Sequence, residues 1–160
     1  MVKYIAYTLI FLLLTVISIG GWFVYRFYQN YQNPTPVFKT SFVGGKELLV
    51  ELAISEKEWI LGLSGRSSLP ETQGMLFISD QLALPSFWMK DMLIPLDIIW
   101  IREGEIIAID GNIPVPETEE TPLSTYHPPK GVDMVLEVNA GWSEKNEIEV
   151  GDKIEIINQY

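Results

Sequence analysis

The chain has 160 residues, of which 48% are hydrophobic, and a formal net charge of −10 at pH 7. Its 21 acidic residues all lie at or after Glu47, so residues 37–160 carry them against nine basic ones, a balance that repels nucleic acid. There is no cysteine and one histidine, which excludes disulfides, thiolate catalysis and a Cys/His zinc site. Only an all-oxygen site for Ca²⁺ or Mg²⁺ stays open, and we expect no metal and no cofactor.

The N-terminal residues 4–25 contain no charge, and as a helix they are long enough to span a bilayer core of about 30 Å. A cleaved signal peptide is the alternative, but no small-residue cleavage site follows the apolar stretch. We interpret residues 1–28 as a transmembrane anchor or uncleaved signal, 29–36 as a polar, proline-containing stalk, and 37–160 as one β-rich domain.

The predicted orientation places the N-terminus inside the cell and the domain outside. Lys3 and Arg26 flank the apolar segment and nearly balance each other under the positive-inside rule. A large acidic domain is better tolerated on the translocated side than Lys3 is. We therefore expect a single-pass protein of the cell membrane, with its domain on the extracytoplasmic side and the membrane as its first partner.

The start of the domain has two clear local signals. Residues 47–54 alternate between apolar and polar positions, which is the period of a half-buried strand. Ser55 and Glu58 then have the spacing of a capping box, which predicts a short helix that includes Trp59. Further strands are predicted at residues 75–78, 86–92, 96–102, 105–110, 133–139 and 153–157.

The connections between these elements indicate the fold class. Glu103 and Gly104 predict a tight hairpin, and residues 141–146 predict a helical turn. About seven strands joined by turn-length gaps favour a mainly β sandwich or partly closed barrel rather than βαβ units. Residues 111–131 hold five prolines and no periodicity, which is typical of a mobile insertion or a functional lid.

Charged residues inside apolar strands are the candidate site. Asp97 and Glu137 each interrupt an apolar run, Lys90 shares one face of its segment with Trp88, and Arg66 follows the predicted helix. An isolated buried charge is strongly unfavourable unless it is paired, so these side chains are expected to find one another. We predict that the two cations and two carboxylates converge in one pocket beside Trp88.

Such a pocket has three interpretations. It is a structural ion-pair network that holds strand register, or a ligand site for a carboxylate, phosphate or sugar hydroxyl. In the ligand site Arg66 and Lys90 donate, Trp88 is a platform, and Asp97 or Glu137 accepts. The third interpretation is a hydrolase-like enzyme that uses Asp97 and Glu137 as paired carboxylates. A protein-protein adaptor would instead show an exposed apolar patch, and whether the chain is an enzyme stays open.

Short motifs run through residues 38–157. They are Gly62-Leu63, Arg66, Leu69-Pro70, Gly74-Met75-Leu76-Phe77, Phe87-Trp88-Met89-Lys90, Ile94-Pro95-Leu96-Asp97-Ile98-Ile99, Val135-Leu136-Glu137, Gly141 and Val150-Gly151-Asp152. With them the chain resembles the family called domain of unknown function 192. The resemblance implies a jelly-roll-like, β-rich domain of bacteria and archaea, often behind a signal or anchor, without an established activity. The family motif includes Arg66, Trp88, Lys90, Asp97 and Glu137, whereas Asp91-Met92 replaces the usual Asn-Thr-like pair.

Overall fold

The computed structural model describes residues 21–22, 36–117 and 124–157 of the chain. The contacts divide the chain into two units, Met1–Pro36 and Val37–Tyr160. Apart from residues 21, 22 and 36, the predicted anchor and stalk lie outside the described residues. Within the described ranges, no helix is both long enough and apolar enough to cross a membrane.

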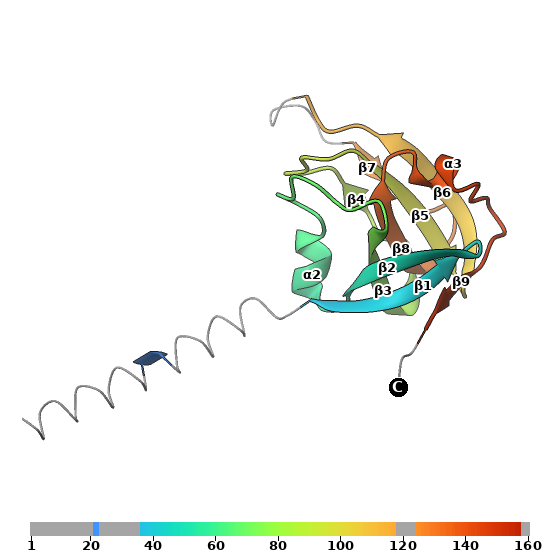
Figure 1. Cartoon of the computed structure of the whole chain (residues 1–160), viewed down its shortest axis with the longest axis horizontal. Helices are drawn as coiled ribbons and strands as arrows, with labels where there is room; N and C mark the ends of the chain where they lie inside the picture. The colour runs from blue at the N-terminus through green and yellow to red at the C-terminus, as the bar shows by residue number, and fades with distance from the viewer. Residues whose placement is uncertain (1–20, 23–35, 118–123, 158–160) are drawn as a thin grey trace, which may run out of the picture. The chain divides into compact units, whose positions relative to one another are not determined.

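The second unit is mainly β, as predicted. Seven strands form one sheet in the order β6-β5-β8-β3-β2-β1-β9, and β4 pairs with β7 in a small second sheet. Figure 1 shows the large sheet curled into a half-barrel, which agrees with the partly closed barrel expected from the sequence. The strands are β1 (Val37–Val43), β2 (Lys46–Ala53), β3 (Gln73–Ala83), β4 (Phe87–Trp88), β5 (Leu96–Arg102), β6 (Glu105–Ile113), β7 (Thr125–Tyr126), β8 (Val132–Asn139) and β9 (Ile154–Ile156).

The curl brings the two edges of the sheet together beside the hairpin between β5 and β6. Ile106 N donates to the Asp152 carbonyl at 2.9 Å, and Ile154 N donates to the Gly104 carbonyl at 3.0 Å. Glu103 and Gly104 both have positive φ, 52° and 77°, as a tight hairpin of this kind requires. The predicted hairpin is therefore confirmed, and it also anchors the last strand.

One connection differs from the expectation that the domain has no βαβ unit. β2 and β3 pair in parallel, with Leu52 opposite Leu76, and α2 (Glu56–Leu61) lies in the crossover between them. The predicted capping box is present at Ser55 and Glu58. The prediction was wrong here because strand pairing between distant segments leaves no local signal.

Each face of the sheet carries a hydrophobic core. The inner core is the side to which all seven strands contribute, and the outer core is the side covered by α2, β4 and the segment around Met92. The inner core contains Val43, Leu48, Val50, Leu52, Leu76, Ile99, Ile101, Ile106, Leu136, Val138, Trp142, Ile148 and Ile154. The outer core contains Ala53, Leu63, Leu69, Met75, Phe77, Phe87, Met89, Met92, Ile94, Leu96, Ile98, Trp100, Ile113, Val132 and Val135.

Candidate functional site

Glu137 is an acidic side chain that faces the outer core. On β8 it lies opposite Met75 of β3 and Ile98 of β5, both of which belong to that core. Directly opposed residues of neighbouring strands project to the same side of a sheet. Glu51 of β2 lies opposite Met75 as well, so two carboxyl groups share this face with one strand between them.

Arg66 binds the first of these carboxyl groups. Its Nη1 and Nη2 donate to the two oxygens of Glu51 at 2.7 and 2.9 Å, a two-point contact that matches the planar guanidinium to the carboxylate. The hydrogen bonding to Glu51 raises the pKa of Arg66. The Glu51 side chain is only 11% exposed, so the pair is a half-buried one, and Glu51 is neutralised by it.

The second carboxyl group, that of Glu137, is buried without such a partner. Its Oε2 atom has no hydrogen-bond partner among the described residues. Burial raises the pKa of Glu137 to about 8, and the nearby charge of Arg66 opposes this rise without cancelling it. At pH 7 Glu137 is therefore mostly a neutral acid, which can donate a hydrogen bond as well as accept one.

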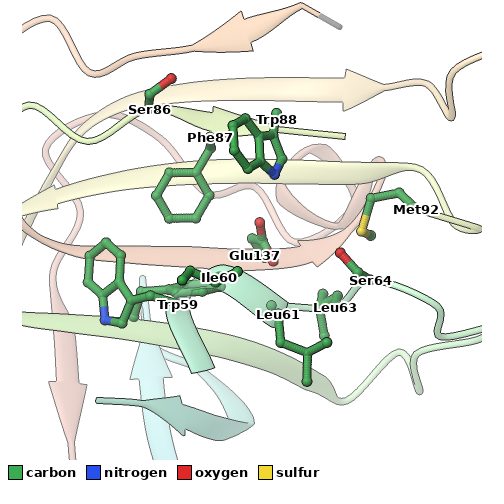
Figure 2. Close-up of a pocket in the computed structure, with 12 residues that line it drawn as sticks. Trp59, Ile60, Leu61, Leu63, Ser64, Ser86, Phe87, Trp88, Met92 and Glu137 are labelled. Atoms are coloured by element: carbon green, nitrogen blue, oxygen red, sulfur yellow. The ribbon is translucent and has the colours of Figure 1, made fainter. Parts of the chain in front are cut away.

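A cavity of about 240 Å³ opens above this carboxyl group. Figure 2 shows Glu137 between Phe87 and Trp88 on one side and the side chains of α2 and the residues after it on the other. The walls are aromatic and aliphatic, and Ser64, Ser86 and Glu137 are the polar side chains among them. The apolar lining residues are Trp59, Ile60, Leu61, Leu63, Phe77, Phe87, Trp88 and Met92.

The aromatic wall is held in place by edge-to-face contacts. The ring centroids of Phe77 and Phe87 are 5.0 Å apart at an interplanar angle of 89°, and those of Trp59 and Phe77 are 5.4 Å apart at 74°. Phe87 contacts Trp100 in the same manner at 5.6 Å. This network ties Trp59, Phe77 and Phe87 to β3 and β5, whereas Trp88 lies outside it and is 51% exposed.

The loop after α2 must pass close to the buried acid. Gly62 has a φ of 49°, and a Cβ placed on it would lie 3.8 Å from Glu137 Oε2 and 3.5 Å from Phe77. A side chain at this position would therefore be strained by its backbone and would project toward the carboxyl group. The glycine leaves the space above Glu137 open.

A second, wider cavity of about 490 Å³ shares Ile60, Leu61, Ser64 and Trp88 with the first. Four exposed charged residues line this second cavity at its outer rim: Glu56, Lys57, Lys90 and Asp91. The Ser64 hydroxyl donates to the Lys90 carbonyl at 3.0 Å, and Gly65 N donates to the Asp91 carbonyl at 2.8 Å. These bonds join the two walls of the opening.

The predicted convergence of four charges is wrong in part. Trp88 and Glu137 line the first cavity, and Arg66 lies near enough to Glu137 for its charge to act on it, although it does not line the cavity. Lys90 is exposed and forms no ion pair with any residue that the structure describes, although it lines the outer cavity. Asp97 lies on the other face of the sheet, because its partner on β8 is Val138 of the inner core.

Asp97 has a structural partner set of its own. Its carboxylate accepts hydrogen bonds from the backbone N–H groups of Asn112, Gly141 and Ser143 at 2.8, 2.9 and 2.9 Å, and the residue is 1% exposed. Two of these donors belong to the start of α3 (Trp142–Lys145), whose N-terminal N–H groups lack partners within the helix. Asp97 thus joins β5, the end of β6 and α3.

Sequence reasoning missed Glu51. The alternation of residues 47–54 assigned it to a solvent-facing side, but residues 51–53 are all buried, and Arg66 from the loop after α2 binds Glu51. No local pattern marks this contact. For metal binding, no group of three or more Asp, Glu or His side chains is found within residues 36–117 and 124–157.

The fold and the pocket together define a class of protein, a small β half-barrel domain with one buried acid beneath an aromatic cavity. Within that class the chain belongs to the DUF192 family, described as "Uncharacterized ACR", whose model matches residues 39–156. The resemblance seen in the motifs is thereby confirmed. No curated protein matches the chain significantly.

Two solved structures are similar to the chain. A Sinorhizobium meliloti 1021 protein, provisionally called a transcription regulator, is 28% identical with a TM-score of 0.69, and the match covers 76% of this chain and 95% of that one. A protein of unknown function from Novosphingobium aromaticivorans DSM 12444 is 27% identical with a TM-score of 0.65, over 79% and 96%. Both are similar in fold over almost their whole length.

Proposed function

We propose that the domain binds a small organic molecule in the cavity above Glu137. The observation that carries this proposal is the buried carboxyl group of Glu137, which lines the cavity and whose Oε2 atom has no hydrogen-bond partner among the described residues. An unsatisfied buried polar group costs about 1–3 kcal/mol, and an apolar side chain would avoid that penalty. A ligand group that bonds to Glu137 would offset it.

A purely structural role accounts for Arg66 and Glu51 but not for Glu137. The Arg66–Glu51 pair is closed, with both carboxylate oxygens bonded, and it links the loop after α2 to the sheet. Glu137 adds nothing to that bond network through its Oε2 atom. Binding is therefore favoured over scaffolding for this one residue, while Arg66 and Glu51 shape the site.

Hydrolysis by paired carboxylates has less support. That chemistry needs two acids on either side of one bond. Asp97 faces the inner core, whereas Glu137 faces the outer one, so the sheet separates them. Glu51 shares the face of Glu137, but Arg66 occupies both of its oxygens. The arrangement provides one free acid, which suits recognition of a ligand group better than acid-base cleavage.

We test the cavity by filling it. Ser86 is an exposed residue that lines it, and Ser86→Trp should place an indole in the opening. We expect the variant to weaken binding of every fragment at least tenfold, while the free energy of unfolding changes by no more than about 0.5 kcal/mol. The measurement is NMR of the ¹⁵N-labelled full chain in lipid nanodiscs, titrated with cationic, neutral and anionic fragments.

The matched control is Ser67→Trp, which adds the same ring to an exposed serine that does not line the cavity. It should bind fragments as the unmodified chain does. If no fragment of any charge shifts the signals of α2 and β8, or if Ser86→Trp binds as well as Ser67→Trp, the domain has no small-molecule site here.

We further propose that residues 1–28 anchor the chain in the cell membrane and that the domain lies on the extracytoplasmic side. The uncharged residues 4–25 and the acidity of the part after Glu47 support this placement. Since the chain has no cysteine, single cysteines report on topology without background. In intact cells a membrane-impermeant maleimide should label Ser67→Cys, and it should label Val2→Cys only after lysis. The reverse pattern would contradict the orientation.

A further inference from the structure

We propose that the ligand is an organic cation, a substituted ammonium whose positive group sits between the aromatic wall and the carboxyl group of Glu137. This inference rests on the proposed binding function and specifies the chemistry of that same cavity. It differs from the ligand expected from the sequence, which was a carboxylate, phosphate or sugar hydroxyl. Three independent features favour a cation: the balance of charges around Glu137, the aromatic residues that line the cavity, and the electrostatic field of the acidic domain.

Among the residues that line the first cavity or act on Glu137, no cation is free to bind an anion, because Lys57 and Lys90 line the outer cavity instead. Arg66 is the only basic residue near Glu137 on the described outer-core face, and its two terminal nitrogens already bond to Glu51. An anionic ligand would therefore add an uncompensated negative charge to a buried site, which is strongly unfavourable. A cationic ligand with ionised Glu137 leaves the same site neutral.

The lining suits a cation for a second reason. Four aromatic residues border the cavity, namely Trp59, Phe77, Phe87 and Trp88. The faces of such rings attract ammonium groups, and tryptophan does so most strongly. Phe87, Trp88 and Glu137 line the same cavity, as Figure 2 shows, so an ammonium group bound there would have aromatic rings and a carboxyl group among its neighbours.

The whole domain adds a long-range attraction. From residue 37 onward, 21 acidic residues stand against nine basic ones, and the summed field raises the local concentration of cations. The rim of the outer cavity is itself balanced, because Glu56 and Asp91 accompany Lys57 and Lys90. The net charge of the rim is therefore close to zero, so the rim does not favour an anionic ligand over a cationic one.

Binding of a cation would couple to a proton. In the empty protein at pH 7 Glu137 is mostly neutral, because burial holds its pKa near 8. An ammonium ligand favours the carboxylate, so binding releases the proton, and affinity rises with pH until Glu137 is ionised without ligand. The charged groups around it are Arg66 from the loop, Glu51 from β2, Glu56 and Lys57 from α2, and Lys90 and Asp91 from the segment after β4.

The test compares three probes of nearly equal shape and different charge: benzylammonium, benzyl alcohol and benzoate. In calorimetric titrations of the full chain in nanodiscs, benzylammonium should bind at least tenfold more tightly than the other two. Its affinity should rise about fivefold to tenfold from pH 6 to pH 7. Buffers with different heats of ionisation should show the release of nearly one proton per ligand.

Glu137→Gln keeps the size of the side chain and removes its charge. It should lose at least tenfold in benzylammonium affinity, with no proton release, and keep its affinity for benzyl alcohol. Glu47→Gln, the same change at an exposed position outside the cavities, should bind like the unmodified chain. If benzyl alcohol or benzoate binds tightly and Ser86→Trp abolishes this binding, the inference that the ligand is a cation is wrong, but the small-molecule site remains. Failure of all three probes to bind would overturn both.

Discussion

Asp97→Ala should lower the free energy of unfolding by about 3–5 kcal/mol, because it leaves one buried and two partly buried backbone N–H groups without an acceptor. The donors are the N–H groups of Asn112, Gly141 and Ser143, all within 2.9 Å of the carboxylate. Through them Asp97 joins the hairpin of β5 and β6 to α3, which begins more than 40 residues after Asp97 in the chain. Urea denaturation of the full chain, followed by tryptophan fluorescence, measures the loss.

Two further variants sharpen this test. Asp97→Asn keeps one carbonyl acceptor but turns an NH₂ group toward a backbone donor, so we expect an intermediate loss. Asp80→Ala removes a carboxylate from an exposed position of β3 and should change stability by no more than about 0.5 kcal/mol. Since Asp97 and Glu137 lie on opposite faces, folded Asp97→Asn should still bind benzylammonium normally. A loss below about 1 kcal/mol for Asp97→Ala would contradict the structural role.

Glu137→Gln should make the protein more stable than the unmodified chain at pH 8, and the advantage should shrink as the pH falls to 5. The pKa of Glu137 is raised from 4.5 to about 8 in the folded state, so the folded protein holds a proton that the unfolded chain loses. Stability therefore decreases as pH rises through this window, by at most about 1.4 kcal/mol per pH unit, and the decrease ends above pH 8. Glutamine cannot ionise, so the variant does not lose unfolding free energy in this way.

The measurement is the difference in unfolding free energy between variant and unmodified chain at pH 5, 6, 7, 8 and 9, without ligand. Glu47→Gln is the control, because its exposed carboxylate should give a difference that hardly changes across this range. Parallel curves for Glu137→Gln and the unmodified chain would mean that Glu137 is ionised throughout. The proton-coupled binding proposed above would then have no basis.

Local patterns predicted much of the secondary structure. The capping box at Ser55 and Glu58 and the hairpin at Glu103 and Gly104 both form as expected. β5 has the predicted bounds, Leu96–Arg102. Two strands were missed: β1, and β7, whose two residues pair only with β4. β4 is shorter than the predicted residues 86–92. In these cases a distant partner, rather than local propensity, decides where pairing begins and ends.

The candidate site was predicted in part for the same reason. The argument that charges in apolar strands must be compensated holds for Asp97 and Arg66, whereas Glu137 has no hydrogen-bond partner for its Oε2 atom among the described residues. The argument could not assign these residues to one face of the sheet or the other, because that depends on the register between β5 and β8. In the structure Ile98, and not Asp97, lies opposite Glu137. Glu51 was overlooked because nothing near it in the sequence shows that Arg66 folds back over β2.

The sequence by itself determined that the domain is β-rich, because local alternation and turn residues predict strands. It also determined which charged residues lie in apolar segments, where burial of an unpaired charge is unfavourable. Only the tertiary structure decided which partners they have. Because β2 pairs with β3 in parallel, Glu51 lies where Arg66 can bind it. Because of the register of β5 against β8, Asp97 lies on the other face and binds backbone N–H groups. Glu137 is left as the acid beneath the aromatic cavity, since pairing of distant strands sets which side chains meet.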